Sequence, residues 1–177
     1  MEYSIEKNLH PLRYGIVLSL ITLLYGFGLG GAFGAFESNI KGYLKANAEN
    51  VSVSVYHGDQ AKIKKVSDKS WVYFKRAHLH ANGLGATSIG LILLLSFLPI
   101  ETRIKSINAI MIGLGSLGYA LFWMFAGLKA PGMGSTHLAK ESLKFIAVPS
   151  SGLCVVGLLM VIFFSVKTFF GKSGPES

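Results

Sequence analysis

The sequence predicts an all-α integral membrane protein, a single four-helix transmembrane bundle that occupies residues 1–177. Two observations predict this class. Hydrophobic residues make up 51% of the chain, and they gather in four blocks, each long enough to cross a bilayer, which takes about twenty apolar residues. None of these blocks contains Asp, Glu, Lys or Arg, whereas a soluble helix of that length would carry a charged face.

The blocks place the four spans at about 14–36, 77–98, 107–128 and 145–166. The link between the second and third spans is short, and the link between the third and fourth is longer. Residues 37–76 form the one substantial extramembrane segment. Because the chain crosses four times, both termini lie on one side of the membrane and this segment lies on the other.

The extramembrane segment shows two patterns. In FESNIKGYLKANAEN the apolar residues recur at helical spacing, which predicts that the first helix continues as an amphipathic surface helix. The stretch VSVSVY at 51–56 alternates apolar and polar residues as a half-buried strand does. QAKIKKV at 60–66 follows the turn HGD and can return as a second strand. We therefore expect a small β-hairpin over the membrane face.

The chain is basic, with a formal net charge of +8. Its cations flank the spans, where Lys and Arg meet anionic lipid head groups, so no nucleic-acid partner is expected. Eleven Lys and Arg lie on the side of segment 37–76 and six on the side of the termini. This count alone would put the larger loops in the cytoplasm. Because Arg103 and Lys105 occupy the tightest loop, we expect the termini to face the cytoplasm instead. If the organism is bacterial, we expect the protein in the inner membrane.

Glycine-rich stretches occur inside the spans. GFGLGG and GLGSLG both fit the GxGxxG pattern, but a dinucleotide fingerprint requires a strand before it and a helix after it in a soluble unit. Close helix packing explains them better, because small residues let helix backbones approach each other in lipid. Gly26, Gly30 and Gly34 make one bare stripe on the first helix, and we expect a close neighbour against it.

Several function classes lack their chemistry. Cys154 is the one cysteine, which excludes an intrachain disulfide and attachment of a c-type haem. Ion-coupled transporters usually keep an acidic or basic residue near the middle of the membrane, and none lies deep in a span here. A hydrolase would need a nucleophile with a base in reach, and Ser150 and Ser151 have no evident partner at their depth. Electron transfer and a structural role in a larger complex are the classes that remain.

Histidines stand out at the start of the second and fourth spans. On a helix His78 and His80 are about 200° apart, so they cannot both face one partner. His137 precedes the fourth span on the same side of the membrane. Two imidazoles from parallel helices can bind a six-coordinate b-type haem between them. We expect His137 to pair with His80 or His78, and we favour His80 because Gly83 and Thr87 share its helical face.

Other side chains could complete this site. Lys75 and Arg76 would pair with haem propionates, and Met133 could serve as a thioether ligand. The three histidines are also enough in number for a zinc site, although no acidic residue lies close in the sequence to complete one. Interfacial histidines can equally stay hydrated or bind lipid phosphate, so an interface without a cofactor is the alternative.

The segment RAHLHANGLG, residues 76–85, resembles the Arg-x-His-x-His-x-x-x-x-Gly helix segment of small membrane proteins related to the haem-binding subunit of haem–copper oxidases. Arg76, His78, His80 and Gly85 occupy the matching places. The match covers about ten of the 177 residues, and the further histidines that copper would need are missing. The resemblance implies a helix that binds or adjoins haem, and it does not imply oxygen reduction.

These features together predict a small subunit of a larger membrane complex of the respiratory kind. It would transfer electrons through one haem b, with a quinone or a cytochrome as redox partner. The alternative is a cofactor-free accessory subunit whose glycine stripes dock neighbouring membrane chains. No independent catalytic activity is expected in either case.

Overall fold

The computed structural model describes residues 5–171, which are helical almost throughout. Four of the helices are long and apolar enough to cross a membrane, judged by length and composition, so the predicted set of four apolar spans is confirmed. The elements follow in the order α1 (Ile5–Leu9), the 3-10 turn η1 (His10–Leu12), α2 (Arg13–Glu49), α3 (Ser52–Tyr56), α4 (Gln60–Phe97), α5 (Thr102–Met133), α6 (Thr136–Glu141) and α7 (Lys144–Phe170).

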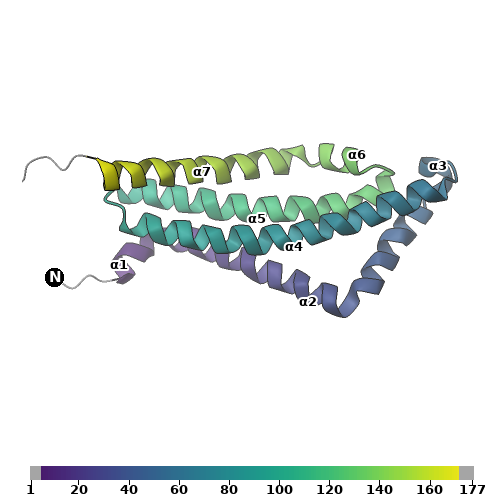
Figure 1. The fold of residues 1–177 in the computed structure, drawn as a ribbon, viewed down its shortest axis with the longest axis horizontal. Helices are drawn as coiled ribbons and strands as arrows, with labels where there is room; N and C mark the ends of the chain where they lie inside the picture. The colour runs from purple at the N-terminus through teal and green to yellow at the C-terminus, as the bar shows by residue number, and fades with distance from the viewer. Residues whose placement is uncertain (1–4, 172–177) are drawn as a thin grey trace, which may run out of the picture.

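The four long helices form an elongated bundle with α4 and α5 antiparallel at its centre (Figure 1). α2 packs against both of them on one side, and α7 packs against α5 on the other. The start of α2 and the end of α7 lie at the same end of the bundle (Figure 1), as four crossings require. Only 11% of the apolar stretch of α7 is buried inside the bundle, against 50% for α5, so α7 is a peripheral helix.

α2 bends sharply at Phe36, where a φ of −132° and a ψ of 22° interrupt the helix. The first half of α2 diverges from α4 as it approaches this bend, and the second half returns to the beginning of α4 (Figure 1). Leu44 is buried there against Trp71 and Phe74 of α4. The helical continuation of the first span is therefore confirmed, and the bend makes it a brace for α4.

The predicted β-hairpin is wrong. Its first expected strand is the short helix α3, and its second belongs to the beginning of α4. His57 and Gly58 adopt left-handed backbone conformations, with φ of 53° and 78°, and so end α3. The Asp59 carboxylate accepts a hydrogen bond from the Lys62 N–H at 2.9 Å and caps the start of α4. The HGD stretch thus ends one helix and begins the next.

A cap cluster of buried side chains joins the ends of the helices on the side of the extramembrane segment. Its core residues come from α2, α3, α4, α5 and α6: Ala48, Tyr56, Ile63, Val66, Ala130 and Ala139. The Tyr56 hydroxyl donates a hydrogen bond to the Pro131 carbonyl oxygen at 2.7 Å. Burial raises the pKa of the Tyr56 hydroxyl and keeps it a neutral donor. The cap cluster fixes the second half of α2 relative to α4 and α5.

Candidate functional site

His78 projects from α4 toward α2 and forms a hydrogen bond at the level of the apolar span. Its Nδ1 lies 2.8 Å from the Gly26 carbonyl oxygen. Because a carbonyl only accepts, the neutral ring carries its proton on Nδ1 and donates it. Nε2 is then left with a free lone pair. Histidines that ligate metals commonly show this arrangement, in which a backbone carbonyl fixes the tautomer of the ring.

Asn82 completes the polar contact around His78. The Asn82 side-chain nitrogen lies 3.2 Å from His78 Nδ1, and its side-chain oxygen is buried without a hydrogen-bond partner. An Nδ1 that donates to Gly26 cannot accept from Asn82. Turning the amide end for end would bring its oxygen to Nδ1 as a second acceptor of that proton. Gly26, His78 and Asn82 therefore form one polar link between α2 and α4.

The glycine stripe on α2 makes room for this link. A Cβ at Gly30 would lie 2.8 Å from His78 Cε1, and a Cβ at Gly26 would overlap the Asn82 amide. Gly34 has nothing within 4 Å of a Cβ position. The expectation of a close neighbour is thus confirmed for Gly26 and Gly30, and the neighbour is the chain's own α4.

A groove of about 430 Å³ begins where the seam between α2 and α4 opens, and the His78 ring is in its wall. Phe33 contributes an aromatic edge, with its ring centroid 5.8 Å from that of His78. Gly34, Trp71 and Lys75 also line the groove. The groove therefore combines an imidazole, aromatic faces, a bare stretch of helix and one cation.

His80 turns to the opposite face of α4, as the helical angle predicted. Its ring meets Tyr119 edge-on at a centroid distance of 5.1 Å and lies parallel to Trp123 at 6.0 Å, both on α5. One turn nearer the cap cluster, the Arg76 guanidinium lies 4.8 Å from the Trp123 ring centre. Gly83 is exposed, with nothing within 4 Å of a Cβ position. Lys75 thus lines the His78 groove, whereas Arg76 lies against Trp123 of α5.

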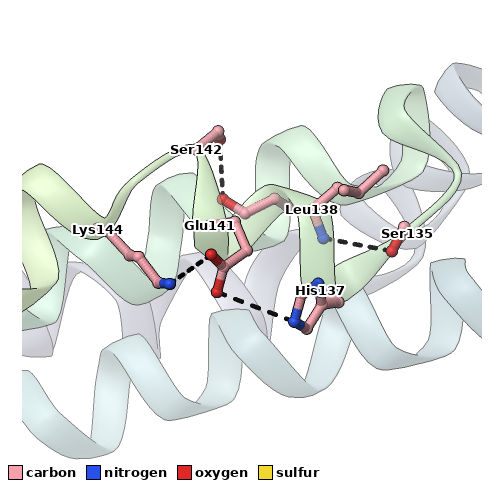
Figure 2. Close-up of polar contacts among 7 residues, drawn as sticks. Ser135, His137, Leu138, Glu141, Ser142 and Lys144 are labelled. Carbon is pink, nitrogen blue, oxygen red and sulfur yellow. Dashed lines mark hydrogen bonds and ion pairs between the residues drawn. The ribbon is translucent and has the colours of Figure 1, made fainter.

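His137 lies on α6, which is on the opposite side of the α4–α5 pair from α2 (Figure 1). Figure 2 shows His137 and Lys144 both directed at Glu141. His137 Nε2 is 3.8 Å from Glu141 Oε1, and Lys144 pairs with the other carboxylate oxygen. The hydrogen bond from Lys144 holds the pKa of Glu141 below its ordinary value. The His137 side chain is 76% exposed.

The expectation that no acidic residue lies close to His137 is wrong, because Glu141 pairs with it. Glu141 stands four positions later on the same helix, and this spacing was the signal in the sequence. Met133 packs against the cap cluster. Within residues 5–171, no hydrogen bond, ion pair or ring contact joins His137 to His78 or His80, so their pairing stays a prediction.

The same residues 5–171 contain no group of three or more His, Cys, Asp or Glu side chains that could hold a metal ion. No protein-family model, no curated protein and no solved structure matches the chain. The resemblance of residues 76–85 to the oxidase-related segment therefore stays a prediction. The two faces of α4, with His78 on one and His80 on the other, carry the side chains that bear on function.

Proposed function

We propose that this protein is a small integral membrane subunit of a larger membrane complex, that it binds one b-type haem in the groove between α2 and α4, and that His78 is an axial ligand. A haem would supply one-electron transfer, with a quinone or a cytochrome as the redox partner. The termini face the cytoplasm in this proposal.

The hydrogen bond from His78 Nδ1 to the Gly26 carbonyl, at 2.8 Å, carries the proposal. It leaves Nε2 as the ligand atom and holds the ring in place before a ligand binds. Gly34 leaves the α2 wall bare for a flat ring, and Lys75 offers a cation for a propionate.

A second candidate function is an accessory subunit without a cofactor. It is favoured because two of the predicted ligands have other contacts: His137 pairs with Glu141, and Met133 packs against the cap cluster. Gly28 and Gly31 also have nothing within 4 Å of a Cβ position. An exposed face of small residues on α2 suits a closely packed partner helix.

The visible absorption spectrum of the purified full chain, oxidised and then reduced, separates the two functions. The wild-type protein from haem-replete cells is expected to show a sharp reduced spectrum of a b-type haem. His78→Ala is expected to lose it. His80→Ala and His137→Ala are the matched controls, because each removes an imidazole from the same side of the membrane without touching the groove.

Two other results of these spectra would contradict the proposal. If His80→Ala and His137→Ala lose the haem while His78→Ala keeps it, the ligand pair is the one that the sequence predicted and the assignment of His78 is wrong. If the wild-type chain purifies without haem absorption, the electron-transfer function is excluded. The accessory function then takes its place.

A further inference from the structure

A second concave site lies outside the apolar spans, between the second half of α2 and the beginning of α4. It encloses about 480 Å³, within the range of about 300–1,000 Å³ that small-molecule sites occupy. Ile63 and Trp71 provide an apolar floor, and Lys41, Lys45 and Lys64 stand around it. We call it the lysine pocket.

The charge of the lysine pocket favours an anion. Three lysines face one acidic residue, Asp68, in its wall. Lys41 and Lys45 each pair with a glutamate four residues away on α2, but these pairs are about half exposed and such pairs contribute little. Lys64 forms no ion pair with any residue in 5–171. A bound anion can therefore recruit these ammonium groups at small cost.

The apolar side of the lysine pocket is held in place by ring contacts. Phe33 meets the Trp71 ring edge-on at 4.9 Å, and the Lys41 ammonium lies 5.3 Å from the centre of that ring. Ser67 also lies in the pocket wall, but its Oγ is covered by protein atoms and does not reach the pocket. The pocket is thus rigid on its apolar side, and its lysines are the groups that can meet the charge of a ligand.

The height of the lysine pocket decides where its ligand comes from. A helix rises 1.5 Å per residue, so Lys64 stands about 20 Å beyond Ala77, where the apolar span of α4 begins. The lipid head-group layer is only about 5–7 Å thick on each side of the hydrocarbon core. The pocket therefore opens into water, above the head groups.

We infer that the lysine pocket binds a soluble organic oxyanion, a phosphate or carboxylate joined to an apolar body. The ammonium groups of Lys45 and Lys64 hold the oxyanion as point charges. The apolar body lies on Ile63 and Trp71. The site is separate from His78 and does not depend on a haem.

Calorimetric titration of the full chain in phosphatidylcholine nanodiscs tests this inference, with phenyl phosphate as the probe. Phenyl phosphate is expected to bind saturably and more tightly than inorganic phosphate or benzyl alcohol, because only it presents both groups. Lys64→Gln is expected to weaken binding about tenfold, as loss of one charged contact does. Lys65→Gln is the matched control, because Lys65 does not line the lysine pocket and borders the neighbouring hollow on α4 that Lys64 also lines, and it is expected to bind like the wild type.

Three results would overturn the inference. They are no saturable binding of phenyl phosphate, equal affinities for Lys64→Gln and Lys65→Gln, and displacement of the probe when phosphatidylglycerol replaces phosphatidylcholine. The last result would make a lipid head group the occupant. His78→Ala should bind phenyl phosphate unchanged, so that failure of the haem proposal and failure of this one can be told apart.

Discussion

The seam between α5 and α7 and the seam between α2 and α4 both depend on glycine, but different atoms face the glycines. In the first seam a Cβ at Gly115 would lie 2.7 Å from the Ser150 carbonyl oxygen, and a Cβ at Gly157 would lie 2.6 Å from the Ile112 side chain. In the second seam the Gly30 position faces the His78 ring. Both seams contain close core packing, and the second also holds the Asn82 amide and the His78 ring against its glycines.

The two seams also differ along their length. The seam between α2 and α4 opens beyond Gly30, because α2 diverges from α4 up to its bend at Phe36 and only then returns. The His78 groove and the lysine pocket follow one another along this opening and share Trp71. Gly115 therefore serves close packing against backbone, whereas Gly30 leaves space for a polar side chain beside an opening.

The largest effect is expected from Gly115→Ala. The new methyl group meets the Ser150 backbone, which cannot move without shifting α7, so the free energy of unfolding should fall by about 1–3 kcal/mol. Thermal unfolding followed by circular dichroism measures it. Gly90→Ala, with nothing within 4 Å of the Cβ position, is the control and should be neutral. Equal melting of Gly115→Ala and the wild type would show that α7 is not closely packed.

The cap cluster keeps the opening between α2 and α4 in shape, and Tyr56→Phe tests this. Loss of the hydrogen bond to Pro131 should cost about 1 kcal/mol of unfolding free energy. Because burial raises the Tyr56 pKa above its unfolded value, its contribution is full below about pH 10 and is lost as the pH rises through the folded pKa. The phenylalanine variant should therefore lose less stability than the wild type in alkaline solution. Identical alkaline profiles of the two proteins would contradict this role.

Gly30→Ala should affect the site more than the fold. The methyl group meets only the edge of the His78 ring, which can turn away at the cost of its hydrogen bond to Gly26. We expect a small drop in melting temperature and a clear loss of haem per chain, measured by the reduced spectrum. Gly34→Ala, one turn further along the same stripe, meets no atom and should keep the stability of the wild type. A Gly30→Ala chain with full haem content would argue that the His78 ring is not the ligand.

The smallest effect is expected from Glu141→Gln on α6, which touches neither seam. Lys144 lowers the pKa of Glu141, so the pair contributes above the ordinary carboxyl pKa and its contribution is lost as the pH falls through the lowered value. The substitution should leave global unfolding unchanged and speed hydrogen exchange only in the amides of α6. Faster exchange throughout α7 as well would show that α6 anchors the fourth span.

The spans were predictable because the absence of charge over twenty residues has one physical meaning in a membrane protein. The strand predicted for VSVSVY was wrong because a short alternating stretch also fits a single helical turn. The choice between strand and helix depends on the left-handed backbone of His57 and Gly58, which the alternation of side chains does not reveal. The divergence of His78 and His80 followed from the helical angle alone. The lysine pocket could not be predicted from the sequence, because Lys45 and Lys64 come to line one pocket only through the bend of α2 at Phe36.

The central claim is that the His78 imidazole is itself a ligand and more than a link between α2 and α4. The most direct measurement is the haem content of full-length His78→Gly, purified with and without free imidazole, read from the reduced absorption spectrum. We expect the variant to lose its haem and to recover it when imidazole fills the space left by the side chain. Haem content equal to that of the wild type without imidazole would contradict the claim.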